Sequence, residues 1–250
     1  MDLREHTATQ QRHPWEVARF RFLLAQLRTR TPLHLLQRVL DAGAGDAWFS
    51  NHLMEFLPNT ATITCWDLEY TSETMTSFSE HLPKSIRLTR DRPQQPHDLV
   101  LLLDVLEHVA EDRAFLSQLV AESLRPGGWL LFTVPAWQRL FSRHDVWLHH
   151  HRRYAPAQAI AVLQASGLDV LASGGLFHSL LLPRLAALAL ETLRPAATDP
   201  TPAIAWPHGA LLTQGVQAAL ALDNAVSDRA ARLGVPLPGL SFWALCRRAA

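Results

Sequence analysis

Short apolar runs alternate along the chain with segments whose apolar residues recur at helical spacing. The run at 98–103 is apolar on both faces, as in a strand at the centre of a parallel sheet. One strand is predicted at the start of the stretch 38–57. Further strands are predicted at residues 61–66, 86–88, 97–103, 129–134, 168–172 and 241–246. One amphipathic helix is predicted at the end of the stretch 38–57. Further amphipathic helices are predicted at residues 72–81, 114–124 and 156–166. This alternation predicts an α/β fold with a mostly parallel sheet, whose last strand pairs antiparallel beside residues 168–172.

Two helical regions lie outside this alternation. An apolar face along residues 15–30 predicts a surface helix ahead of the sheet. Residues 176–236 predict a helical insertion before the last strand, with helices at 177–193 and 209–233 and a proline-rich loop at 194–207.

The segment 177–193 is strongly apolar, but Pro183, Arg184 and Glu191 interrupt it. It therefore falls short of the roughly 20 apolar residues that cross a bilayer, and no transmembrane helix is expected. We expect it either to cover a substrate pocket or to lie at a membrane interface.

Composition changes this picture mainly by exclusion. The 250 residues are expected to form one domain, 1–250. With 23 basic and 23 acidic residues the formal net charge is zero, so no overall field draws the protein to nucleic acid or anionic lipid. Cys65 and Cys246 lie in apolar runs, which is typical of core thiols in a reduced, cytoplasmic protein. The polar first residues differ from a signal peptide, so export is not expected.

A glycine-containing turn follows the first predicted strand. Gly43 and Gly45 let the backbone bend sharply and let a ligand approach, so the turn is suited to a nucleotide-sized group. No third glycine completes a GxGxxG pattern, and alone the turn is a weak signal. Asp67 ends the next strand about 20 residues later, where a carboxylate can accept hydrogen bonds from both hydroxyls of a ribose. Together these features favour an adenosine-containing cofactor.

Four motifs then occur in a characteristic order. They are DAGAG at 41–45, Asp67, DVLEH at 104–108 and LRPGG at 124–128. In this order the chain resembles the class I S-adenosylmethionine-dependent methyltransferases, over roughly residues 39–176. Ala47 stands where a third small glycine is often found in the first motif. The resemblance implies a doubly wound, Rossmann-like sheet of seven strands, S-adenosylmethionine as cofactor, and methyl transfer to an acceptor.

The resemblance also implies which residues contact the cofactor. They are Asp41, Ala42, Gly43 and Gly45 at its amino-acid end, Asp104 and Val105 beside its sulfur, Asp67 and Leu68 at its ribose, and Asp91 at its adenine amine. Asp104 and Val105 follow a central strand, at the crevice edge where open α/β sheets bind ligands. Asp91 is the nearby acid of a short loop with two prolines, and a solvated loop acid is the alternative for it.

The segment 137–154, WQRLFSRHDVWLHHHRRY, combines histidines, arginines and aromatic residues. In the family topology it lies over the methyl donor. It also resembles a pattern of one methyltransferase subgroup, an Asp, a His five residues on and then RRY, which maps onto Asp145, His150 and 152–154. We expect His150 or His108 to be the general base, because imidazole titrates near neutral pH. The alternatives are a solvated loop for His150 and a structural role for His108.

The segment HPWEVARFRFLL, at 13–24, resembles the start of the same subgroup, so residues 1–37 are expected to form a helical lid over the cofactor mouth. Substrate contacts are expected from Trp15, Arg19, Trp137, Arg153 and Tyr154. Packing of Trp15 on its own helix, and simple pairing of the arginines with acids, stay open. The aromatic residues and the apolar helices favour a small, partly hydrophobic acceptor over DNA or RNA.

Asp104, Glu107 and His108 also resemble the ExxEH cluster that binds a divalent cation in ubiquinone-pathway O-methyltransferases and small-RNA 2′-O-methyltransferases. Two carboxylates and an imidazole can bind Mg²⁺, Mn²⁺ or Zn²⁺. The first position here is Asp, whose side chain has a shorter reach than Glu. No metal is therefore expected.

Two other classes of protein stay open. A NAD-binding oxidoreductase shares the first strand, the turn and the ribose acid, but has no use for DVLEH or LRPGG. A non-catalytic ligand-binding protein could use the same scaffold and contact a membrane weakly through residues 177–193. The sequence leaves open the acceptor, the methylated atom and the oligomeric state.

Overall fold

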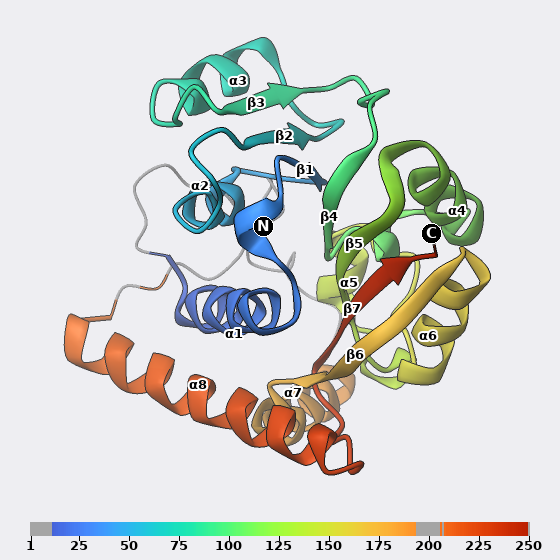
Figure 1. The fold of residues 1–250 in the computed structure, drawn as a ribbon. Coiled ribbons are helices and arrows are strands. Elements are labelled where there is room, and N and C mark those ends of the chain that lie inside the picture. The colour runs from blue at the N-terminus through green and yellow to red at the C-terminus, as the bar shows by residue number, and fades with distance from the viewer. Residues whose placement is uncertain (1–11, 194–205, 207, 250) are drawn as a thin grey trace.

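The computed structural model describes residues 12–193, 206 and 208–249. A seven-stranded sheet in the order β3-β2-β1-β4-β5-β7-β6 runs through it (Figure 1). The strands are β1 (Arg38–Ala42), β2 (Thr62–Trp66), β3 (Ile86–Thr89), β4 (His97–Leu103), β5 (Leu124–Pro135), β6 (Leu168–Leu176) and β7 (Ser241–Arg248). Only β7 is antiparallel to its neighbours, β5 and β6. The expected Rossmann-like α/β fold, with an antiparallel last strand beside the sixth, is confirmed.

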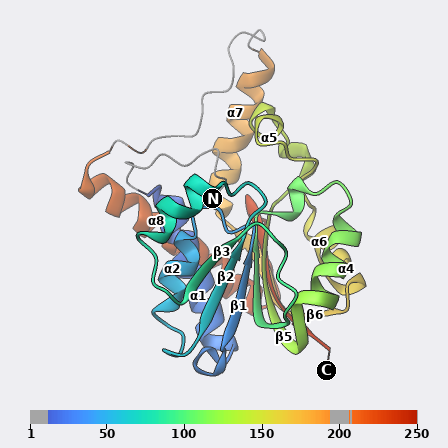
Figure 2. The same ribbon diagram turned by 90° about the horizontal axis from the view of Figure 1, so that it is seen from above.

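Helices cover both faces of the sheet (Figure 2). They are α1 (Pro14–Arg30), α2 (Trp48–Met54), α3 (Ser72–Ser79), α4 (Asp112–Ser123), α5 (Arg143–Trp147), α6 (Pro156–Ala165), α7 (Leu181–Leu193) and α8 (Ala210–Arg232). The helices α1, α2 and α8 lie on one face, and α4 and α6 lie on the other. The fold is therefore doubly wound, with an apolar core on each face.

Strand β4 explains why its sequence is continuously apolar. Successive side chains of a strand point to opposite faces. Leu99 and Leu101 accordingly join the core under α1 and α2, whereas Val100 and Leu102 join the core under α4 and α6. Because both faces are covered, no position between Leu99 and Leu102 reaches water.

The N-terminal helix α1 packs against α8, although the two lie far apart in the sequence. Gln26 Nε2 donates a hydrogen bond to Asp228 Oδ1 over 3.1 Å. Pro14 stands at the start of α1, where its missing amide hydrogen leaves no helical bond unmade, and the His13 ring accepts a hydrogen bond from Trp15 N. An ion pair between Arg19 of α1 and Asp104, directly after β4, brings α1 close to the carboxyl ends of the strands.

Several element boundaries differ from the predicted ones. Strand β5 begins at Leu124 instead of residue 129, because Leu124 pairs with His97 before the register shifts between His97 and Leu99. The PGG segment therefore lies within an irregular start of the strand. Helix α3 ends at Ser79 instead of 81, and α4 begins at Asp112 instead of 114.

The helix predicted at 177–193 is also divided. Phe177 adopts a left-handed φ of 59°, and the 3-10 helix His178–Leu180 separates it from α7. The predicted loop 194–207 lies outside the described residues apart from Trp206, and so do the first eleven residues. Among the helices that are described, none has the length and hydropathy that crossing a bilayer requires.

Candidate active site

A cavity of about 860 Å³ opens at the carboxyl ends of β1, β2 and β4. The tips of these strands contribute Ala42, Gly43, Asp67, Leu68, Asp104 and Val105 to its wall. Trp15 and Arg19 reach it from α1, and residues 144–153 close it on the opposite side. The size is that of a site for a cofactor or a small ligand, and its place is the crevice where open α/β sheets bind ligands.

The turn after β1 packs directly on the tip of β4. Gly43 has a φ of 72°, and a Cβ atom there would lie 2.4 Å from Val105 Cγ2. The Gly43 amide donates a 2.7 Å hydrogen bond to Trp66 O, so the turn is also tied to β2. Glycine at this position lets three strand tips meet around one opening.

Asp67 faces this opening from the end of β2. Its Oδ2 accepts a 2.9 Å hydrogen bond from Gly45 N, and its Oδ1 accepts one of 2.9 Å from Glu69 N. Each carboxylate oxygen has a further lone pair for a ligand hydroxyl. Gly45 thus holds Asp67 in place and does not itself line the cavity.

Asp41 and Asp91 lie away from the main cavity. Asp41 is buried beneath the turn, where its Oδ2 accepts a 2.7 Å hydrogen bond from Ser50 Oγ. Burial raises the pKa of Asp41 to about 6, against the lowering effect of Ser50. Asp91 lines a second hollow, of about 570 Å³, that shares Leu68 with the main cavity.

Asp104 joins α1 to the site. Its Oδ2 forms an ion pair with Arg19 Nη1, and its Oδ1 accepts a 2.8 Å hydrogen bond from Thr133 Oγ1. Burial alone would raise the pKa of Asp104, but Arg19 and Thr133 outweigh it and lower the pKa. The Arg19 guanidinium also lies 5.0 Å from the centre of the Trp15 ring.

Glu107, His108 and His150 come together beside Asp104. One ligand atom of each lies within 4.8 Å of the others, so among the described residues this is the group that could hold a metal ion. The Glu107 carboxylate is fully buried, and no described residue donates a hydrogen bond to it. Burial, together with the charge of Asp104, raises the pKa of Glu107 well above its usual range.

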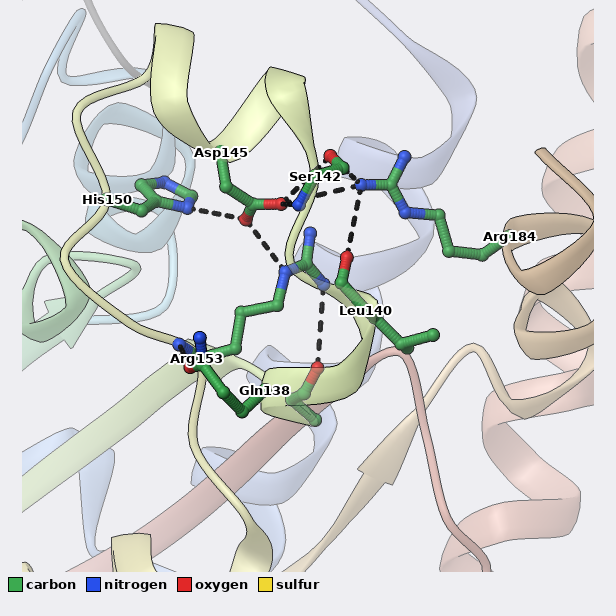
Figure 3. Close-up of polar contacts among 8 residues, drawn as sticks. Gln138, Leu140, Ser142, Asp145, His150, Arg153 and Arg184 are labelled. Atoms are coloured by element: carbon green, nitrogen blue, oxygen red, sulfur yellow. Dashed lines mark hydrogen bonds and ion pairs between the residues drawn. The ribbon is translucent and has the colours of Figure 1, made fainter. Parts of the chain in front are cut away.

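Asp145 binds the Nδ1 side of the His150 ring (Figure 3). His150 Nδ1 lies 2.9 Å from Asp145 Oδ1, which also accepts a 2.7 Å hydrogen bond from Arg153 Nε. Asp145 Oδ2 accepts hydrogen bonds from Ser142 N and Ser142 Oγ over 2.9 and 3.0 Å and so caps α5. Arg184 of α7 approaches the same oxygen to 3.5 Å.

Two of the expected substrate residues do not reach the cavity, which corrects that expectation. Tyr154 is fully buried in the core, and its hydroxyl donates a 2.7 Å hydrogen bond to Asp112 Oδ2. Burial chiefly raises the pKa of Tyr154. Trp137 directs its indole Nε1 to Gly239 O over 2.9 Å and packs against the core of the α4 and α6 face. Both side chains therefore hold loops in place and are absent from the cavity wall.

Other residues of the wall were not named individually from the sequence, although most lie in the segments 137–154 and 177–193, for which a place over the methyl donor or over a substrate pocket was considered. They are Phe115, Val146, Leu148, His149, His151, Phe177, Leu180, Arg184 and Leu240, with parts of the neighbouring turns. For Phe177, Leu180 and Arg184 the available signal was the apolar run that contains them. Nothing in the local sequence around Phe115 and Leu240 indicates a place in the site. Only the folding of the whole chain brings these two residues to the cavity.

Comparisons with known proteins agree with this arrangement. A family model described as a methyltransferase domain matches residues 15–173. A search of curated proteins finds no match. The [4+2]-cyclase SpnF is similar in structure, with a TM-score of 0.56 at 17% identity over 97% of this chain and 85% of that one.

Two bacterial structures are similar as well. An S-adenosylmethionine-dependent methyltransferase from Mesorhizobium loti has a TM-score of 0.54 at 16% identity, over 90% of this chain and 96% of that one. The N-methyltransferase NodS from Bradyrhizobium japonicum, in complex with S-adenosyl-L-homocysteine, has a TM-score of 0.50 at 17% identity, over 64% and 79%. At such identities these likenesses concern the fold alone.

Proposed function

Because this chain belongs to the methyltransferase domain family and is an S-adenosylmethionine-dependent methyltransferase, we propose that its acceptor is a small, partly hydrophobic molecule and that His150 removes the acceptor's proton. The observation that carries this proposal is that one cavity contains both Asp67, suited to a ribose, and His150. A cofactor and an acceptor can therefore meet within it.

The cofactor lies across the strand tips in this proposal. Asp67 binds the ribose hydroxyls, and the second hollow, which Leu68 and Asp91 line, holds the adenine. The glycine turn, supported by Asp41, cradles the amino-acid end, with Ala42, Gly43 and Gly45 in its backbone. Asp104 and Val105 flank the sulfur. Arg19, whose charge Asp104 neutralises, and Trp15 cover the opening from α1.

The acceptor enters between α1 and residues 144–153. Val146, Leu148, Phe177 and Leu180 give that end of the cavity an apolar wall, which supports a partly hydrophobic acceptor. Methyl transfer is an in-line displacement: the acceptor atom forms a bond to the methyl carbon as the bond from that carbon to sulfur breaks. The protein's main task is to hold both reactants in this geometry.

His150 is the better placed of the two candidate bases. Its Nδ1 is engaged by Asp145, and its ring lies in the cavity wall with the other nitrogen available. His108 lies beside it, the ring centres being 4.6 Å apart, and is proposed to contact the acceptor. Proton removal by an imidazole needs no metal, so none is included in the proposal.

The test uses radiolabelled S-adenosylmethionine with a panel of hydroxyl- and amine-bearing aromatic compounds. We expect wild-type protein to label one class of them and His150→Ala to lose about 10²-fold or more in rate, with unchanged binding of S-adenosylhomocysteine. The control is His81→Ala, an exposed histidine outside the cavity wall, which should keep its rate. Full turnover by His150→Ala would remove His150 from the mechanism.

One observation favours an additional contact with membranes. Leu182, Leu185 and Leu190 are 76, 47 and 54% exposed on α7, the helix whose Arg184 lines the cavity. We therefore propose a weak peripheral membrane contact through α7, which sedimentation with phosphatidylcholine vesicles would test by loss of binding in Leu182→Ser. Cys65 and Cys246 are free, buried thiols, which supports a reducing, cytoplasmic setting.

A further inference from the structure

The two oxygens of Asp145 have different partners (Figure 3). Oδ2 caps the first turn of α5 through Ser142 and meets Arg184. Oδ1 accepts hydrogen bonds from His150 and Arg153. A residue that only capped a helix would need one oxygen. The second oxygen is therefore available for His150.

Asp145 determines the form of the His150 ring. Its pKa is held well below the usual range, because hydrogen bonds from His150, Arg153 and Ser142 outweigh the cost of burial. An ionised carboxylate can only accept hydrogen bonds, so Nδ1 of His150 must carry the proton in their shared bond. In the neutral ring Nε2 then has the free lone pair.

The backbone fixes the same ring from a second direction. His150 N donates a 2.9 Å hydrogen bond to Asp145 O, so main chain and side chain of Asp145 both hold His150. Arg153 keeps the carboxylate in place at 2.7 Å, and Asp145 has no exposed side-chain surface. These contacts favour one orientation of the ring, with Nδ1 toward Asp145.

We propose that Asp145 is a positioning residue for methyl transfer: through Oδ1 it keeps His150 in the Nδ1-protonated tautomer and presents a proton-accepting Nε2 to the acceptor. This inference rests on the proposed role of His150 as base. Asp145 itself is absent from the cavity wall. Its contribution is the correct tautomer and orientation of another side chain.

Substitution by asparagine should reverse the tautomer. The backbone amide of Ser142 cannot rotate, so it retains the asparagine carbonyl oxygen at the Oδ2 position. The asparagine NH₂ group then faces His150 Nδ1 and Arg153 Nε. Arg153 can only donate and loses its acceptor there, whereas a neutral imidazole can accept, so the NH₂ group donates to His150 Nδ1 and the ring proton moves to Nε2. A ring with its proton on Nε2 cannot accept one from the acceptor.

The first experiment is ¹⁵N NMR of the histidine rings in the full chain without substrate, with His150→Gln used to assign the signal. We expect a protonated Nδ1 and an unprotonated Nε2 in the wild-type protein and the reverse in Asp145→Asn. We expect no change in Ser142→Ala, because the Ser142 hydroxyl bonds Asp145 Oδ2 and Arg184 but not Oδ1, the oxygen that faces His150. A wild-type ring with its proton on Nε2 overturns the proposal, whether or not Asp145→Asn folds.

The second experiment compares rates with the acceptor identified above. Asp145→Asn should lower kcat by about 10²-fold or more, as loss of the orienting acid does in a Ser-His-Asp triad, with S-adenosylhomocysteine binding unchanged. In a His150→Gln background the same substitution should change kcat less than about twofold. An equal loss in both backgrounds would mean a merely structural role and would overturn the inference. Full activity of His150→Gln would instead refute the proposed base, while the NMR result still decides the tautomer.

Discussion

Two buried aspartates in this protein have pKa shifts of opposite sign. Asp41 has Ser50 as its side-chain donor, so burial dominates and its pKa rises to about 6. Asp145 is also enclosed, but His150, Arg153 and Ser142 all donate to it, and its pKa falls. At the scale of single residues, the number of donors decides whether a buried carboxylate stabilises the fold or strains it.

Asp41→Asn should stabilise the free protein, increasingly so as the pH rises. The unfolded carboxyl titrates near 3.8 and the folded one near 6, so the folded state binds more protons between these values and loses stability as the pH rises through them. Near pH 8 the substitution should raise the free energy of unfolding by on the order of 2–3 kcal/mol, and near pH 5 by about half of that. Urea unfolding at both pH values measures this.

The matched control is Asp98→Asn, for which the opposite sign is expected. Asp98 accepts hydrogen bonds from Gln37 N, Arg38 N and Arg125 Nε, and its pKa is lowered although burial opposes this. Its removal should therefore lower stability above pH 4. A stability gain of Asp41→Asn over the wild-type protein that is no larger near pH 8 than near pH 5 would contradict this expectation.

Asp67→Ala should weaken binding of S-adenosylhomocysteine by about 100-fold or more. Two hydrogen bonds to an ionised group contribute about 1.5–3 kcal/mol each, and the variant also releases Gly45 N. Calorimetric titration gives the affinity. Asp91 lies at the exposed rim of the second hollow, and Asp91→Ala should weaken binding of S-adenosylhomocysteine less than about fivefold. Equal losses in the two variants would argue against a ribose contact at Asp67.

Residue type and spacing predicted the strand-end positions but not side-chain direction. Asp67 and Asp104 were placed at strand ends, and such ends meet at one edge of a parallel sheet. Tyr154 follows two arginines in a polar segment, yet its partner Asp112 lies 42 positions earlier and draws it into the core. A contact over that distance leaves no trace in local sequence.

At the scale of elements, helix α7 is fastened near its start by Arg184. Its Nη2 lies 2.5 Å from Ser142 Oγ and 3.5 Å from both Leu140 O and Asp145 Oδ2. The rest of α7 points away from the sheet with several exposed leucines (Figure 2). Burial lowers the pKa of Arg184, which nevertheless stays charged beside Asp145.

Arg184→Met should loosen α7 without unfolding the protein. Loss of hydrogen bonds from a charged group weakens local structure by about 1–3 kcal/mol, equivalent to about 10- to 100-fold faster amide exchange in α7. Hydrogen exchange with mass spectrometry would show this. Arg139→Met, at an exposed site in the 3-10 helix Gln138–Leu140, should leave exchange in α7 unchanged. Faster exchange throughout the sheet would contradict local anchoring.

Element boundaries were less predictable than element types. The alternation of apolar runs identified all the strands of the sheet because burial on both faces requires it. The early start of β5 depends on pairing between Leu124 and His97, which a proline-glycine segment alone would not indicate. The break at Phe177 likewise requires a left-handed backbone that its residue type does not favour.

At the scale of the whole molecule, ligand binding should appear as thermal stabilisation. A ligand at 100 times its Kd stabilises the folded state by about 2.7 kcal/mol, which for a chain of this size corresponds to a Tm increase of about 5–10 °C. S-adenosylhomocysteine should produce this increase in a thermal-shift measurement. NAD should produce none, since the turn lacks the third glycine of dinucleotide sites. A larger shift with NAD would contradict the cofactor placement.

The shape of the whole cavity could not be predicted from the sequence, because it depends on how distant segments pack together. Its wall combines α1, three strand tips, residues 144–153, residues 177–184 and the start of β7. Each group was interpretable alone, but their convergence depends on how α1 packs on α8 and how Arg184 joins α7 to α5. Packing between distant elements sets the shape of the acceptor end, while strand order sets the cofactor end.

The position of β7 between β5 and β6 has a consequence for biosynthesis. A ribosome makes residues 168–176 well before residues 241–248, yet β6 pairs with β7 and with no other described strand. The nascent polypeptide must therefore carry an unpaired β6 while α8 is still being translated. The half of the sheet from β3 to β5 can assemble during translation, whereas the other edge is completed only after the last strand leaves the exit tunnel.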